Sequence, residues 1–164
     1  QHYCTIANPV LRDASGTPKI TKNGQVQLNH GDQEIRHATH PPTPFPLYPG
    51  ENLIGKVQAL QVVGPLAALR VTALRNFEDG DTKRRAGDEW LFRGPGTYIP
   101  RIEVQVMEVI RAIVISPNSA LKLRARNACK DQAGSTRKAG EEWLVRTPGA
   151  YLPDGADEDI EPVS

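Results

Sequence analysis

One stretch of the chain concentrates side chains that bind metals or transfer protons. The segment HGDQEIRHATH holds His30, Asp32, Glu34, His37 and His40. Imidazoles and carboxylates of this kind bind zinc, so a metal-dependent enzyme is one function to consider. The spacing is not the HExxH of a zinc-binding helix, and Pro41 and Pro42 follow directly, which disfavours a helix. We therefore interpret the segment as a polar loop and predict no metal site.

Two adjacent carboxylate pairs, Asp88-Glu89 and Glu141-Glu142, are the next candidates for chemistry. Neighbouring side chains on a strand point to opposite faces, so neither pair forms a dyad by itself. The pairs also recur at equivalent places in a repeated sequence, whereas acid–base catalysis needs groups that converge on one site. We predict no catalytic residue and no enzyme activity.

Two loops resemble ligand-binding motifs but do not match them. Counted from Asp79, an EF-hand needs Gly at position six and Glu at position twelve, where this chain has Arg84 and Trp90. The segment GSTRKAG ends at Gly140 and continues with Glu141, so the Lys-Ser/Thr of a phosphate loop is missing. We predict no cofactor.

The amino-acid composition indicates which kind of secondary structure carries these residues. Fourteen Gly and fourteen Pro in 164 residues favour short strands and turns over long helices. No apolar run approaches the ~20 residues that cross a bilayer, so no membrane segment is expected. Only two cysteines, Cys4 and Cys129, are present, which predicts free thiols in a reducing compartment. The chain shows no signal peptide, and the missing initiator Met indicates a piece of a longer protein.

A duplicated segment organises the chain. AGDEWLFRGPGTYIP (86–100) and AGEEWLVRTPGAYLP (139–153) are identical at ten of fifteen positions. Glycines suit turns, tryptophans supply buried area, and Pro-Gly pairs reverse the chain. The structural repeat signature is Gly87, Trp90, Pro95, Gly96, Tyr98, Gly140, Trp143, Pro148, Gly149 and Tyr151.

The match extends beyond this signature, because 65–77 also resembles 117–129, and a weaker copy without the tryptophan occupies the front. We predict three repeats, at 1–53, 54–106 and 107–164, the last with an acidic tail. Apolar and polar residues alternate in ALRVTAL, ALKLRAR and RIEVQVMEV, which indicates half-buried antiparallel strands. The expected fold is all-β, a tandem array of small antiparallel β-sheet repeat domains of about 53 residues. Asn23-Gly24 predicts a hairpin with a two-residue type I′ turn.

Basic clusters at 83–85 and 137–138 raise the question of nucleic acid. They lack interleaved aromatic residues and any RNA-binding motif. We interpret them as solvated loops and expect no direct contact with nucleic acid.

The segments HYCTIANPV, FPLYPGE, AGDEWLFRGPGTYIPR, ALKLRAR and GEEWLV resemble the N-terminal repeat region of the major vault protein family. The resemblance covers nearly the whole chain. It implies a string of β repeats, many copies of which stand side by side and form the wall of the vault ribonucleoprotein cage. The acidic loop at 79–81 and the histidines at 37 and 40 depart from the family pattern.

The implied partners are other copies of the same chain and, as an alternative function, proteins that the repeats dock, such as the vault poly(ADP-ribose) polymerase. The implied location is the cytoplasm, with a minor nuclear pool. Lateral contacts are expected to combine strand edges, small apolar patches and opposite charges such as Arg84 and Arg85 against Glu78 and Asp79.

Overall fold

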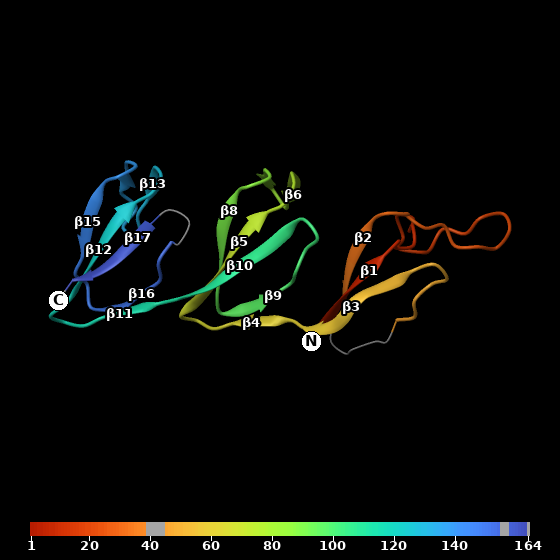
Figure 1. Ribbon diagram of the computed structural model, residues 1–164, viewed down its shortest axis with the longest axis horizontal. Coiled ribbons are helices and arrows are strands. Elements are labelled where there is room, and N and C mark those ends of the chain that lie inside the picture. Colours follow the sequence, from red (N-terminus) through yellow and green to blue (C-terminus); the bar gives the residue numbers. More distant parts are fainter. Residues whose placement is uncertain (39–44, 155–157, 164) are drawn as a thin grey trace. The chain divides into compact units, whose positions relative to one another are not determined.

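The computed structural model describes residues 1–38, 45–154 and 158–163. Its regular elements are all strands in antiparallel pairs, which confirms the all-β tandem array (Figure 1). The chain divides into two compact units, Gln1–Gln61 with Ile99–Ile102, and Val62–Tyr98 with Glu103–Ser164. In the described residues no helix is long and apolar enough to cross a membrane.

The first repeat is a three-stranded sheet in the order β2-β1-β3. Its strands are β1 (His2–Ala7), β2 (Gln33–His37) and β3 (Asn52–Ala59). Cys4 and Ile6 point into the core from β1, and Ile6 is fully buried. Between β1 and β2 the chain makes an extended ladder of single bridges, Val10 with Leu28, Arg12 with Pro18, and Ile20 with Val26.

The hairpin predicted at Asn23-Gly24 is present, but the predicted turn type is wrong. Gly24 has a φ of 78°, whereas Asn23 is not among the described residues with positive φ, as a type I′ turn would require. The N–H of Thr21 donates to Gln25 O at 2.7 Å, and that of Gly24 to Thr21 O at 3.0 Å. The loop is therefore Lys22, Asn23 and Gly24, a three-residue turn that ends in a left-handed glycine.

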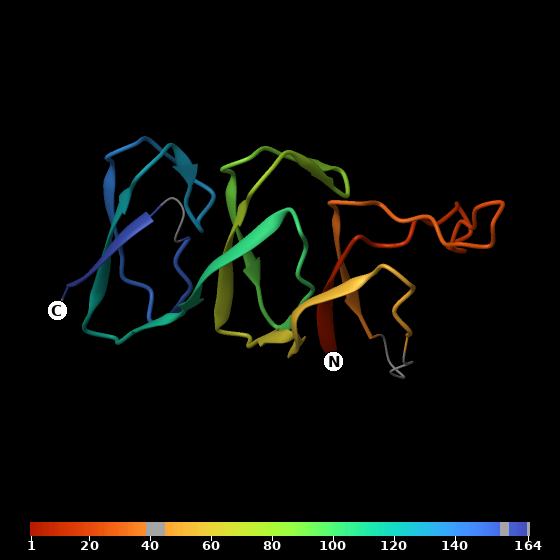
Figure 2. The ribbon, with the colours of Figure 1, turned by 45° about the vertical axis from the view of Figure 1, so that its right-hand side comes forward.

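The second and third repeats share one plan (Figure 2). Each has a three-stranded sheet, β10-β5-β8 or β15-β12-β17, and two small two-stranded sheets. The second repeat consists of β4 (Gln61–Val63), β5 (Ala67–Ala73), β6 (Phe77–Asp79), β7 (Thr82–Arg84), β8 (Glu89–Arg93), β9 (Gly96–Tyr98) and β10 (Val104–Arg111). The third consists of β11 (Ile113–Ile115), β12 (Ala120–Ala125), β13 (Cys129–Lys130), β14 (Thr136–Arg137), β15 (Glu142–Val145), β16 (Gly149–Tyr151) and β17 (Glu158–Val163).

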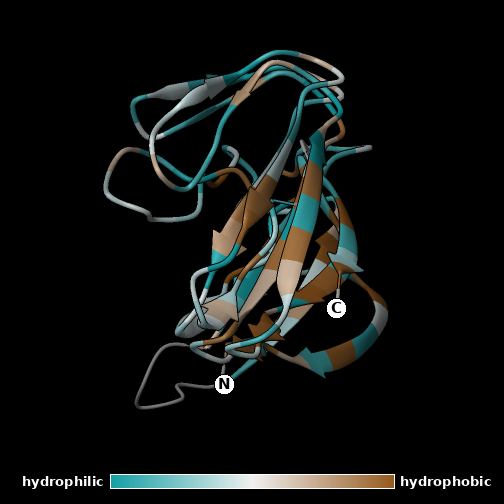
Figure 3. Cartoon of the chain, turned by 90° about the vertical axis from the view of Figure 1, so that its left-hand side faces the viewer, coloured by the Kyte–Doolittle hydropathy of each residue, from teal (hydrophilic) through white to brown (hydrophobic). Residues whose placement is uncertain are grey.

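Each of these repeats has its own core beneath its central strand. Leu69 and Val71 of β5 are fully buried, and Leu121 and Leu123 of β12 occupy the equivalent positions. Arg70 and Lys122 lie between them on the opposite face, so the alternation expected for both strands is confirmed. Figure 3 shows the same alternation of apolar and polar residues along the strands.

The predicted repeat boundaries do not coincide with the ends of the sheets. The junction at 53 and 54 falls inside β3, and that at 106 and 107 falls inside β10. Both strands complete the sheet of the repeat that precedes them. A duplicated sequence has a period but no marked starting point, so the period alone does not locate where a unit begins.

Candidate functional site

The duplicated tryptophans lie on the main sheets of the second and third repeats, packed against the buried cores. Trp90 lies opposite Val71 and packs against the core of the second repeat, as Trp143 does opposite Leu123 in the third. The small hairpin of each repeat places an arginine over the indole. The guanidinium carbon of Arg84 is 4.2 Å from the ring centroid of Trp90. That of Arg137 is 5.0 Å from the centroid of Trp143.

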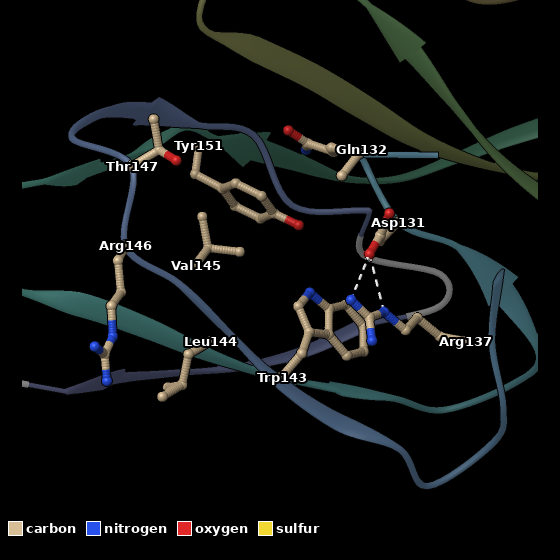
Figure 4. Close-up of a pocket in the computed structure, with 10 residues that line it drawn as sticks. Asp131, Gln132, Arg137, Trp143, Leu144, Val145, Arg146, Thr147 and Tyr151 are labelled. Atoms are coloured by element: carbon tan, nitrogen blue, oxygen red, sulfur yellow. Dashed lines mark hydrogen bonds and ion pairs between the residues drawn. The ribbon is translucent and has the colours of Figure 1, made fainter. Parts of the chain in front are cut away.

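Beside Trp143 is an open hollow of about 360 Å³ (Figure 4). On one side Arg137 binds Asp131, with Nη2 2.9 Å from Oδ2. Burial opposes the ionisation of Asp131, but the N–H of Ser135 and Arg137 outweigh it, so the pKa of Asp131 is lowered. Figure 4 shows Arg146 at the other end of the lining, pointing away from Trp143. The charged groups nearest the ring are thus already engaged with each other.

The duplicated carboxylates close turns. Asp88 Oδ2 accepts the N–H of Arg85 at 2.8 Å, and Glu141 Oε2 accepts that of Lys138 at 2.9 Å. Their neighbours Glu89 and Glu142 begin β8 and β15, and Glu142 pairs with Lys122. The structure therefore brings neither pair together around a common point.

The remaining signature residues shape the chain around these turns. Gly87 and Gly140 have φ values of 90° and 83°, which L side chains rarely adopt. Pro95 and Pro148 directly precede β9 and β16, and Gly96 and Gly149 are the first residues of those strands. The Tyr98 ring meets Phe92 edge-on at 5.3 Å, and Tyr151 is buried in the core of the third repeat.

Gly94 is not in the repeat signature, because the signature keeps residues shared by the two repeats and the third repeat has Thr147 at the equivalent position. A Cβ on Gly94 would lie 1.9 Å from the carbonyl oxygen of Gly64. The chain can pass so close only where residue 94 has no side chain. Gly94 precedes Pro95 in a cis peptide bond.

In the first repeat a carboxylate replaces the tryptophan. Glu34 lies opposite Ile6, as Trp90 lies opposite Val71. Glu34 binds Arg36, which also binds the fully buried carboxylate of Glu51. The N–H groups of Val10 and Tyr48 donate to Glu51 at 2.7 and 2.9 Å. This ion-pair network was not predicted, because Glu51 is distant in sequence from both partners.

The prediction of a polar loop is wrong for Gln33–His37, which form strand β2 and pair with β1. The side chains considered as metal ligands make other contacts. Asp32 accepts a hydrogen bond from Asn29 Nδ2 at 2.7 Å, and Glu34 is bound by Arg36. His37 pairs with Tyr3 in the sheet, and His40 lies outside the described residues. Across residues 1–38, 45–154 and 158–163, no three metal-binding side chains are grouped.

Cys4 and Cys129 are not joined by a disulfide. Cys4 is buried in the first repeat, and this burial raises the pKa of its thiol.

Two equivalent valines form the most exposed large apolar positions of the described chain. Val62 is the middle residue of β4 and is 76% exposed. Val114 is the middle residue of β11 and is 74% exposed. The second and third repeats thus each present one apolar side chain to solvent at the same point of their plan.

Comparison with known proteins agrees with this architecture. A model described as the Major Vault Protein repeat domain matches residues 1–57, and another with the same description matches 61–101 and 113–154. The chain is 58% identical over 98% of its length to the "Major vault protein alpha" of Dictyostelium discoideum. It is 58% identical over 93% of its length to the "Major vault protein" of Homo sapiens, and 55% over its full length to that of Strongylocentrotus purpuratus. It spans 17% to 19% of the length of these curated relatives. The chain belongs to the major vault protein family.

Proposed function

We propose that this chain is part of a structural, non-enzymatic subunit of the vault particle. Its repeats form the wall of the particle when copies of the subunit associate side by side. The observation that carries the proposal is the reuse of one sheet-and-turn plan with the same exposed apolar position in successive repeats. A protein that closes around a cavity needs length and regularly spaced contacts, and duplicated β units supply both.

The exposed valines suit lateral contact. Val62 and Val114 are separated by one repeat, so a neighbouring copy in the same orientation meets both in the same way. Burying one such side chain contributes about 1.5–3 kcal/mol at most. A closed ring multiplies weak contacts, so no single pair needs to be strong.

The expected ion pair between Arg84 of one copy and an acidic residue of the next copy is disfavoured. Arg84 lies over Trp90 within its own repeat, and its Nε is buried. Arg85 remains exposed. We therefore assign the lateral role to the apolar positions and keep only Arg85 as a candidate for an ion pair with a neighbouring copy.

The test is negative-stain electron microscopy of the full-length protein, of which this chain is a part, expressed alone. Closed barrel-shaped shells are the expected result. If only monomers or irregular aggregates form, the wall proposal fails. The docking of partners such as the vault poly(ADP-ribose) polymerase then becomes the leading function.

The isolated chain has a different expected behaviour. With only a few weak lateral contacts, it is monomeric or weakly associating at micromolar concentration. Light scattering that showed a tight closed oligomer of residues 1–164 would contradict this. The cytoplasm, with a minor nuclear pool, is the proposed location, and fractionation with a tagged full-length chain tests it.

A further inference from the structure

We propose that the hollow beside Trp143 in the third repeat is a binding site for a small, neutral aromatic molecule of one or two rings. The site belongs to one repeat of one chain, so it stands or falls separately from the assembly of copies into a wall. The second repeat, which shares the same plan, shows what kind of group fits such a space.

One difference between the duplicated repeats accounts for the hollow. Phe92 in β8 corresponds to Val145 in β15, because EWLFR and EWLVR align without a gap. Both side chains pack against the buried core of their own repeat. Val145 lacks the phenyl ring, and it lines the hollow of about 360 Å³ together with Trp143 and Tyr151.

In the second repeat the phenyl ring of Phe92 fills the equivalent space. It meets the ring of Tyr98, the counterpart of Tyr151, edge-on at 5.3 Å. Its tip lies 3.6 Å from the position that a Cβ on Gly96 would take. Among the described residues, nothing lies within 4 Å of that position at Gly149, the equivalent glycine of the third repeat. The filling ring belongs to the second repeat itself, so the space is not one that a neighbouring repeat has to cover.

The walls of the hollow combine aromatic surface with polar groups, as the walls of small-molecule sites do. Figure 4 shows Trp143, Val145 and Tyr151 around it, with Gln132 also in the lining. Gln132 Nε2 donates to the carbonyl oxygen of Leu152, so the loop after β13 is tied to the residue after β16. A wall fixed in this way keeps the site formed before a ligand arrives.

The charged groups beside the hollow favour a neutral ligand. Arg137 lies over the indole of Trp143 and binds Asp131, so these two charges balance each other. Arg146 also lines the hollow but points away from Trp143 (Figure 4). A charged ligand would therefore lose water without gaining a partner of its own. An aromatic ring needs none, because edge-to-face contact with Tyr151 and burial of its carbon surface stabilise it.

The size of the hollow sets the size of the ligand. Small-molecule sites occupy roughly 300–1,000 Å³, and this hollow of about 360 Å³ lies near the lower end of that range. One ring reproduces the contacts that Phe92 makes in the second repeat, and the remaining volume admits a second ring.

The experiment uses 4-fluorophenol as the probe, because its fluorine signal broadens when it binds a protein of any size. The signal is recorded with residues 1–164 and with the full-length protein of which this chain is a part. Saturable broadening is expected with both. In residues 1–164 the amide signals of β15 and β16 should shift on titration, whereas those of β8 and β9 should not.

Val145→Phe is the decisive variant, because it restores the ring that the second repeat carries. It should abolish the broadening with residues 1–164 and reduce it with the full-length protein. No broadening with the parent chain, or unchanged broadening with Val145→Phe in either protein, overturns the proposal.

Phe92→Val is the reciprocal variant, because it gives the second repeat the residue of the third. It should add a second site beside Trp90, so that more probe is bound at saturation, while circular dichroism confirms that the chain is folded. A folded Phe92→Val chain that binds no more probe than the parent overturns the assignment of the site to the missing ring. If Phe92→Val does not fold, Val145→Phe still decides the outcome.

Competition separates an aromatic site from one that is merely apolar. Phenol should displace the probe, and cyclohexanol, which has the same hydroxyl on a saturated ring, should displace it several-fold less well. Equal displacement by the two compounds overturns the aromatic class. Probe binding that weakens as the concentration of residues 1–164 rises also overturns the proposal, because the occupant is then a side chain of a second copy.

Discussion

The guanidinium of Arg84 lies 4.2 Å above the ring of Trp90, and the third repeat reproduces the arrangement with Arg137 and Trp143 at 5.0 Å. The arginine comes from the small hairpin and the tryptophan from the main sheet. The stack therefore ties two separate sheets of one repeat together.

Arg84→Gln should destabilise the second repeat by about 1 kcal/mol, because it removes the cation from the indole face while keeping most of the side chain's length. Urea denaturation followed by fluorescence in a Trp143→Phe background reports on Trp90 alone. Arg85→Gln, at the exposed neighbouring position, is the control and should stay within about 0.5 kcal/mol of the parent. Equal effects of the two substitutions would contradict the assigned role of the stack.

Gly94→Ala should destabilise the second repeat by about 1–3 kcal/mol, because the new methyl group cannot fit beside the Gly64 carbonyl without moving backbone. Gly64→Ala is a matched control from the same contact, since nothing lies within 4 Å of its Cβ position. The measurement compares the urea denaturation midpoints of the two variants. A Gly94→Ala chain as stable as Gly64→Ala would show that the close approach relaxes at little cost.

Glu51→Gln should destabilise the first repeat by up to about 3 kcal/mol at neutral pH, because it removes the buried carboxylate that binds Arg36 and leaves only the more exposed Glu34 to neutralise that arginine. Hydrogen exchange of the β1 amides measures the effect. Fluorescence should not follow it, because both tryptophans lie in the other unit. Glu34→Gln is the control and should cost less, since Glu34 is 39% exposed.

The ion pair between Glu51 and Arg36 makes the stability of the first repeat sensitive to acid. Burial opposes ionisation of Glu51, but Arg36 and two backbone N–H groups outweigh it and lower its pKa below the ordinary 4.5. The unfolded chain therefore takes up this proton first, and the stabilisation present above pH 4.5 is lost as pH falls through the lower folded pKa. Exchange of β1 amides should accelerate over that range in the parent and show a flatter pH dependence in Glu51→Gln.

Val62→Asp combined with Val114→Asp should abolish shells of the full-length protein while the circular dichroism of residues 1–164 stays unchanged. Both side chains are largely exposed, so a charge there costs the fold little but opposes an apolar contact between copies. Ile20→Asp, at a 62% exposed position of the first repeat, is the control and should leave shells intact. Normal shells in the double variant would remove these valines from the lateral contact.

Several features of the chain were predictable because they are local. The alternation in ALKLRAR placed Leu121 and Leu123 on the buried face, and the structure confirms it. The Asn23-Gly24 pair marked a hairpin, but the turn type depends on which residues pair across it. Because Ile20 faces Val26 and Thr21 faces Gln25, three residues remain for the loop.

The sequence by itself determined that this protein is a series of small β units, because strand alternation and duplicated turn residues are written in short segments. Only the tertiary structure decided what replaces the tryptophan in the first repeat. Sheet register sets Glu34 opposite Ile6, and folding brings Glu51 to Val10 across 41 positions. Burial and pairing of this kind depend on residues far apart in the chain, so no local pattern specifies them.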